Sequence, residues 1–376
     1  MHIVNGTRHL LDATQAMDKA GRRYLVAIAK ATFDFPEAPG GELSLAKDQM
    51  PILGADVFDG EAGLSTPLFE CDYVTVKARC DVTLRASACA PGGEAVRELD
   101  VAFRVAGCEK WARIVGDRTW QLGLLGLTPS EPEPFTSMPI TYGRAFGGSC
   151  EVHGRVEAHL HNPVGRGYAG AHNNAPLRGQ PLPNVEQPGV PVTRSDDSHR
   201  PWSFGPIGRS WQPRVEFAGT YDEQWQEDIF PLLPADFDDR FFQSAPSDQQ
   251  IPFPIGGEDV RLLNLHSRYP QMYFQLPPLD LPMVVLGFDR RVHKLEPVVD
   301  SVIVDAEAER LVVVWRAQHP LQRNLREIEL LAAGSVCKRW WRSRVLGTPD
   351  CGCGGYEVDD DDLSPVNRPL DPWEPA

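Results

Sequence analysis

The amino-acid sequence predicts a mainly β fold, an antiparallel sandwich or open barrel with long ordered loops, together with one C-terminal α-helix. Three observations lead to this prediction. Apolar and polar residues alternate in the first third of the chain, and prolines and aromatic residues are both frequent in the middle. Near the end, apolar residues recur three or four positions apart. With 376 residues, 42% of them apolar, the chain can bury a sizeable core.

Alternating segments in the first third predict β-strands. In VTVKARCDVTLR, residues 74–85, every second residue is apolar, so that one face would lie in the core and the other, with Lys77 and Asp81, would face water. ELDVAFRVAG, residues 98–107, repeats this pattern, and the turn-rich segment 90–93 between the two predicts a β-meander. Further strands are predicted for residues 24–35 and 110–120, the latter with a break at Gly116 and Asp117.

The middle of the chain, residues 129–282, predicts sparse regular structure. Prolines recur every few residues there, and few apolar runs exceed four residues. Large aromatic side chains such as Trp211 and Trp225 distinguish this segment from a disordered one, because they supply apolar surface that ordered loops can bury. We therefore expect long loops that are held in place by aromatic residues.

The C-terminal part predicts a hairpin, a helix and a tail. Residues 302–304 and 311–315 are apolar runs on either side of a turn-like DAEAER segment. Beyond them, apolar residues recur at helical spacing from Leu321 to Trp340, and basic residues followed by Gly347 suit the end of a helix. The predicted units are a β-rich domain over residues 1–317, a helix over 318–347 and a Gly/Cys/Asp-rich tail over 348–376.

Charge and composition exclude several function classes. The 37 Lys and Arg residues face 52 Asp and Glu residues, and the resulting net charge of −15 argues against nucleic-acid and membrane partners. No apolar run approaches the roughly 20 residues that cross a bilayer, and the first residues lack the pattern of a signal peptide. We therefore expect a cytoplasmic protein with reduced cysteines and a basic or uncharged partner.

Histidines in the segment HGRVEAHLH offer a candidate metal site. His159 and His161 would lie on one face of a strand, with His153, Glu157 and His172 nearby in the sequence. A metal-dependent hydrolase that uses the histidines between residues 153 and 172 is therefore the alternative function, although a polar loop rich in histidine is more often plain surface. No phosphate-binding glycine motif and no nucleophile motif occurs, so we expect a non-enzymatic protein without a cofactor.

Several phrases of the loop-rich middle occur together in a characteristic order. They are MPITYGRAFGG, NPVGRGY, LPNVEQP, WQPRVEFAGTYDEQW, LPADFDDRFFQSAPSDQQ and GGEDVRLLNL. In this order they resemble the DUF2169 family of bacterial proteins, and the resemblance covers roughly residues 24–317. It implies an adaptor or chaperone of the type VI secretion system. Such a protein binds a toxic effector, often one with a PAAR-like domain, and helps to load it onto the VgrG-type spike.

The resemblance also marks residues that either bind a partner protein or hold the loops together. Asn and Asp can fix loops by local hydrogen bonds, Arg can bridge carboxylates and carbonyls, and aromatic residues can anchor a loop or contact a partner. Both interpretations stay open for these positions. The candidates are Tyr142, Arg144, Phe146, Asn162, Arg166, Asn184, Glu186, Trp211, Arg214, Tyr221, Asp222, Trp225, Asp236, Asp238, Arg240 and Phe241.

Overall fold

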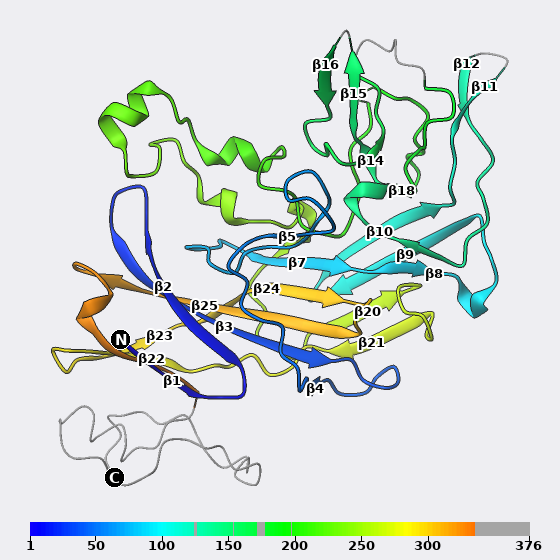
Figure 1. Cartoon of the computed structure of the whole chain (residues 1–376). Coiled ribbons are helices and arrows are strands. Elements are labelled where there is room, and N and C mark those ends of the chain that lie inside the picture. Colours follow the sequence, from blue (N-terminus) through cyan, green and yellow to red (C-terminus); the bar gives the residue numbers. More distant parts are fainter. Residues whose placement is uncertain (124–125, 153, 171–176, 197, 335–376) are drawn as a thin grey trace.

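A computed structural model describes residues 1–123, 126–152, 154–170, 177–196 and 198–334 of the chain (Figure 1). The prediction of a mainly β protein is confirmed, and none of the sheets within these residues closes into a barrel. No helix in this part of the chain has the length and apolar character needed to cross a membrane.

Three larger sheets form the body of the molecule. The seven-stranded sheet contains β19 (Gln250–Ile251), β7 (Cys80–Arg85), β24 (Val298–Asp305), β25 (Arg310–Leu321), β3 (Arg23–Asp34) and β2 (Leu10–Met17) in this order, with β4 (Ser44–Leu45) beside β3. The five-stranded sheet contains β18 (Val185–Glu186), β10 (Cys108–Val115), β9 (Glu98–Val105), β20 (Asp259–Leu263) and β21 (Gln271–Gln275). The four-stranded sheet contains β1 (His2–Gly6), β26 (Ile328–Gly334), β22 (Met283–Gly287) and β23 (Val292–Leu295).

Smaller elements complete the fold. The two-stranded pairs are β5 (Val57–Phe58) with β6 (Pro67–Phe69), β8 (Ser87–Cys89) with β13 (Ser137–Pro139), β11 (Trp120–Gly123) with β12 (Gly126–Pro129), β14 (Phe146–Gly147) with β17 (Arg166–Gly167), and β15 (Ser149–Val152) with β16 (Arg155–Ala158). Single helical turns are η1 (Pro91–Gly93), η2 (Tyr142–Arg144), η3 (Arg214–Ala218), η4 (Trp225–Ile229), η5 (Asp239–Phe242), η6 (Ser247–Gln249) and η7 (Leu325–Glu327).

One hydrophobic core joins the three larger sheets. Leu25 from the seven-stranded sheet, Phe103 from the five-stranded sheet and Val285 from the four-stranded sheet belong to the same cluster of buried side chains. Each fully buried side chain of this kind contributes about 1.5 to 3 kcal/mol relative to an exposed one. The core therefore makes the sheets a single packed body, on which the loops of the middle segment rest.

The predicted strands over residues 24–35 and 98–105 are confirmed, and β24 and β25 form the predicted hairpin. The predicted meander is wrong, because β7 pairs with β19 and β24 whereas β9 pairs with β10 and β20 in another sheet. Residues 74–79 also lie outside any strand. The alternation misled here because two of its polar residues do not face water: Lys77 and Asp81 are buried and form an ion pair of 2.8 Å.

The predicted C-terminal α-helix is wrong for the residues that the structure describes. Residues 318–321 continue β25, η7 is a single turn, and residues 328–334 form β26 between β1 and β22. Asn324 and Glu327 form a capping box that begins η7, but the chain is extended again at Ile328. A central strand is buried on both faces, so its continuous apolar run also fits helical spacing. Residues 335–347 of the predicted helix lie outside the described residues.

His9 supplies a pH-dependent contact with the core. Its ring stacks on Trp315 with 5.2 Å between the centroids, and burial lowers its pKa below 6.5. The folded state thus disfavours the protonated ring, so the stability that His9 contributes is present above pH 6.5 and is lost as the pH falls through the lowered pKa. We expect His9→Phe to reduce the loss of stability between pH 7 and pH 5, as measured by urea unfolding. An unchanged pH dependence would contradict this.

Candidate functional site: a loop scaffold and an exposed aromatic arm

Asn184 lies at the centre of a hydrogen-bonded group that joins the loops after β10, β13 and β17. Its amide nitrogen donates to the Val115 carbonyl at 3.0 Å and to Asp117 at 2.9 Å, and its amide oxygen accepts from Arg144 at 3.0 Å and Arg166 at 3.3 Å. Burial, together with the neighbouring charge of Arg144, lowers the pKa of Arg166 although Asp117 opposes this. These side chains hold loops that are far apart in sequence.

Asn162 fixes the backbone around β14 and β17. Its amide nitrogen donates to the carbonyls of Tyr142 at 2.8 Å and Phe146 at 2.9 Å. Gly147 approaches Asn162 so closely that a Cβ at this position would lie 2.2 Å from the Asn162 carbonyl oxygen, and its φ of 145° lies in a region that side chains disfavour. The glycines of GRAFGG therefore serve close backbone packing.

Glu186 is buried and is held by two donors. Its carboxylate accepts from Arg118 at 2.7 Å and from the backbone nitrogen of Val192 at 3.0 Å. The Arg118–Glu186 ion pair lies where β18 joins β10 of the five-stranded sheet. We call the loops held by Asn162, Asn184 and Glu186 the loop scaffold. Like Asn162 and Asn184, Glu186 has its polar atoms directed into the protein rather than to a partner.

The histidine segment lies in an aromatic cluster around Phe146. The ring centroid of Phe146 lies 5.4 Å from that of His159 and 5.3 Å from that of His199, and the centroids of His159 and His161 are 5.7 Å apart. Within the described residues, no three side chains of His, Cys, Asp or Glu are grouped as metal ligands would be. His153 and His172, which the metal hypothesis also names, lie outside those residues.

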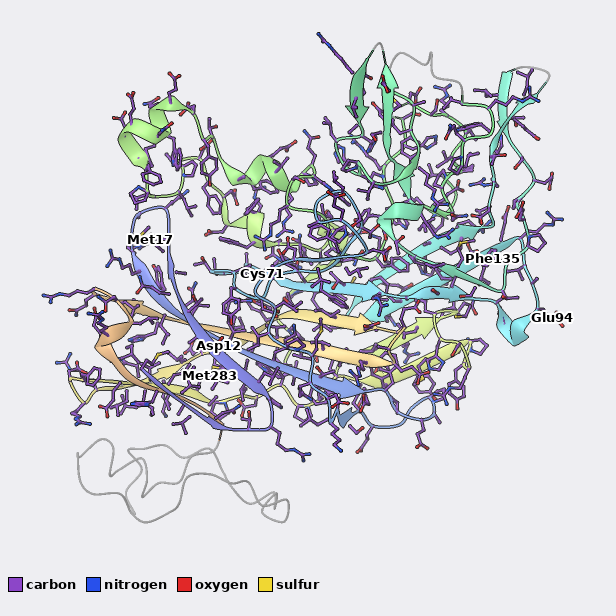
Figure 2. All side chains as sticks on the ribbon, viewed as in Figure 1. Asp12, Met17, Cys71, Glu94, Phe135 and Met283 are labelled. Carbon is purple, nitrogen blue, oxygen red and sulfur yellow. The ribbon has the colours of Figure 1, made fainter. Side chains whose placement is uncertain are left out.

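A second group of candidates lies on a segment that projects from the body of the molecule. We call residues 214–242 the aromatic arm; it contains η3, η4 and η5 (Figure 1, yellow-green, upper left). The arm lies over the turn between β2 and β3, where Lys19 donates to the Phe237 carbonyl at 3.2 Å. Figure 2 marks this end of β2 with Met17, and it shows Glu94 at the opposite end of the molecule.

Trp211 and Arg214 attach the arm to the body. The ring of Trp211 is buried and contacts Tyr142 edge to face with 5.4 Å between the centroids. The Arg214 guanidinium donates to the carbonyls of Phe241 and Ile207, both at 2.8 Å, and also to the Glu70 carboxylate. Arg214 thus ties both ends of the arm to a carboxylate that belongs to the body.

Glu70 is part of an ionic network, called here the buried ionic network, in which Asp56 and Arg209 are partly exposed and the other side chains are at most 9% exposed. Its members are Asp56, Glu70, Lys77, Asp81, Arg209 and Arg214. The Lys77 ammonium lies 3.2 Å from Glu70 and 2.8 Å from Asp81, and Arg209 lies 3.3 Å from Glu70. Burial would raise the pKa of Glu70, but the charges of Lys77, Arg214 and Arg209 outweigh it and lower the pKa to about 2. For Lys77, burial is likewise outweighed by the nearby carboxylates, which raise its pKa.

Asp236 and Thr220 are hydrogen-bonded to each other where the two chain segments of the arm leave its tip; we call this pair the neck of the arm. The Asp236 carboxylate accepts from the backbone nitrogen of Thr220 at 3.0 Å and from the Thr220 hydroxyl at 2.8 Å, and these bonds lower its pKa. Closer to the body, Asp238 accepts from Arg240 at 2.6 Å, which lowers the Asp238 pKa to about 2, while Arg240 lies over Phe217. Internal hydrogen bonds therefore define the path of the chain on both sides of the tip.

The tip of the arm, residues 221–230, presents three aromatic rings. Trp225 contacts Tyr221 and Phe230 edge to face, with 4.7 Å and 5.7 Å between the centroids. Its indole nitrogen donates to the Leu232 carbonyl at 2.9 Å, and Asp222 accepts from the Trp225 backbone nitrogen at 2.8 Å. Tyr221 is 53% exposed and Phe230 is 66% exposed. Both rings are thus held in place while much of their surface faces water.

The tip is also strongly acidic. Over residues 214–242 the sequence has eight Asp and Glu against two Arg, and Arg214 is buried. Four of the acidic side chains lie at the tip and are exposed, and none of them forms an ion pair with another described residue. They are Asp222, Glu223, Glu227 and Asp228.

The candidates from the sequence thus divide into two places. Tyr142, Arg144, Phe146, Asn162, Arg166, Asn184 and Glu186 lie in the loop scaffold, whereas Trp211, Arg214, Tyr221, Asp222, Trp225, Asp236, Asp238, Arg240 and Phe241 lie on the arm or at its base. Sequence reasoning missed Glu70 and Lys77, because nothing near them in the sequence indicates burial. It also missed Phe230 as a site residue, although the aromatic content of the segment was a signal.

Comparison with known proteins shows the family. A family model described as "Uncharacterized protein conserved in bacteria (DUF2169)" matches residues 20–316. No curated protein and no solved structure matches the chain. The match spans most of the chain, including the scaffold and the arm, and the chain therefore belongs to the DUF2169 family.

Proposed function

We propose that this protein is a cytoplasmic adaptor, or chaperone, of the type VI secretion system. It would bind a toxic effector, often one with a PAAR-like domain, and help to load it onto the VgrG-type spike. The proposal follows from the role that the resemblance to the DUF2169 family implies. In this role the chain binds other proteins and catalyses no reaction.

The observation that carries the proposal is the exposed aromatic arm. Tyr and Trp are enriched where proteins bind each other, because they bury a large area while few bonds lose rotational freedom. At the tip, Tyr221 and Phe230 are exposed around Trp225, on a segment whose shape is fixed by its own hydrogen bonds. A rigid, exposed aromatic surface suits the reversible binding of another protein, which an adaptor must later release.

Co-purification from the native host tests the proposal. The affinity-tagged protein is expected to recover an effector or a spike protein, identified by mass spectrometry. A strain that lacks the adaptor is expected to contain less of that effector and to secrete less of it. Recovery of neither protein, together with normal effector levels and secretion in the deletion strain, would show that the proposed function is wrong.

A further inference from the structure

The aromatic tip has a surface chemistry that points to one class of partner. Its three rings offer π faces, which attract ammonium and guanidinium groups. The same ten-residue tip carries the exposed side chains of Asp222, Glu223, Glu227 and Asp228, which form no ion pair with a described cation. We propose that the tip of the arm binds a cationic polypeptide segment in which lysine or arginine side chains alternate with apolar ones. The identity of the protein that carries the segment rests on the proposed adaptor function.

The internal bonds of the arm support a binding surface rather than a loose loop. Thr220 and Asp236 close the neck, and the Trp225 indole nitrogen is already bound to the Leu232 carbonyl. These bonds use backbone and neck groups, and they leave the carboxylates of Glu223, Glu227 and Asp228 directed to solvent. A partner therefore meets a preorganised surface, which reduces the conformational entropy lost on binding.

The base of the arm, around Phe217, Asp238 and Arg240, indicates which kind of side chain the tip would bind. There, Asp238 is paired with Arg240, whose guanidinium lies 4.2 Å from the centre of the Phe217 ring. The base thus shows within the chain how a carboxylate and an aromatic ring together hold an arginine. The tip has the same two components without the arginine. A cationic side chain of a partner would complete the arrangement at the tip.

Binding of defined peptides to the full-length protein tests the inference. The probe is a fluorescein-labelled peptide of eight residues that alternates arginine and leucine, and the comparison peptide alternates glutamate and leucine. Fluorescence anisotropy is expected to show saturable binding of the arginine peptide alone. Binding is expected to weaken as salt increases, because the carboxylates are exposed. Absence of binding, or equal binding of both peptides, would overturn the proposal.

Two double variants locate the binding surface. Tyr221→Ala/Phe230→Ala removes two rings, and Glu227→Lys/Asp228→Lys reverses two charges; each is expected to weaken binding by about tenfold or more. Glu42→Lys/Glu94→Lys is the matched control, since both residues are exposed and it changes the net charge equally. Equal weakening by the control would show attraction by net charge and overturn the proposal. Thermal unfolding checks that all variants fold.

The same variants separate this inference from the proposed function. If the Tyr221→Ala/Phe230→Ala variant recovers the effector or spike protein as well as the unchanged chain does, the adaptor function stands and the tip is not its binding surface. If the unchanged chain recovers neither and the deletion strain has normal effector levels and secretion, the adaptor function fails, while the peptide experiment still decides what the tip binds. Light scattering measures the oligomeric state. If the unchanged chain is a dimer and the tip variants are monomers, the tip binds a second copy of the chain and the proposed cationic partner is wrong.

Discussion

Replacing Glu70 by alanine is expected to lower the free energy of unfolding by about 3 to 5 kcal/mol, the range for a buried ion pair that loses one partner. The side chain of Glu70 is 9% exposed and faces Lys77, Arg209 and Arg214. Its removal leaves these cations close together, with one carboxylate fewer to balance them beside Asp56 and Asp81. Urea unfolding at pH 7, followed by tryptophan fluorescence, measures the change.

An exposed ion pair provides the control for Glu70. Arg261 and Asp259 are 3.1 Å apart on the surface, with both side chains about half exposed, and Asp259→Ala is expected to cost less than about 1 kcal/mol. A loss below about 1 kcal/mol for Glu70→Ala would contradict the importance assigned to the buried ionic network. Because the pKa of Glu70 is lowered to about 2, its contribution is fully present above pH 4.5 and is lost as the pH falls toward 2.

The second large effect is expected for Gly147→Ala. The new Cβ would lie 2.2 Å from the Asn162 carbonyl oxygen and 2.8 Å from the Asn162 Cβ, and the φ of 145° adds backbone strain. Overpacking and strain each cost about 1 to 3 kcal/mol, so we expect a loss of about 3 kcal/mol or more. Thermal and urea unfolding measure it.

Gly189→Ala separates the two causes of the Gly147 effect. Gly189 also has a positive φ, 77°, but nothing lies within 4 Å of a Cβ at that position. It should therefore show only the backbone cost, about 1 to 2 kcal/mol. Equal losses at both positions would mean that the close approach to Asn162 is unimportant.

The parts of the fold that the sequence predicted correctly are those with a strong local signal. The strand over residues 24–35 and the hairpin of β24 and β25 are long apolar runs with clear turns, so neighbouring residues suffice to predict them. The C-terminal helix failed for the same reason, since the local spacing in residues 328–334 fits a helix as well as a strand buried on both faces. Pairing with β1 and β22, far away in the sequence, decides the outcome.

The candidate site could be predicted only in part. The family phrases marked Tyr221 and Trp225, but no periodicity indicated that they would project on an arm. The ionic network gave no signal, because its partners are distant: Glu70 and Arg214 are 144 residues apart in the sequence. Because Lys77 and Asp81 alternate with apolar residues, the sequence predicted that both side chains face water. Their opposite charges form an ion pair, which allows both to be buried.

The buried ionic network also makes the shape of the base of the arm depend on the folding of the rest of the chain. Arg214 is held by Glu70, and Glu70 by Lys77, so the base of the arm takes its form only after strands from both ends of the sequence have assembled beneath it. An excised peptide of residues 211–244 lacks these partners. A protein that contacts the base of the arm as well as the tip would therefore bind folded molecules and not nascent or unfolded ones.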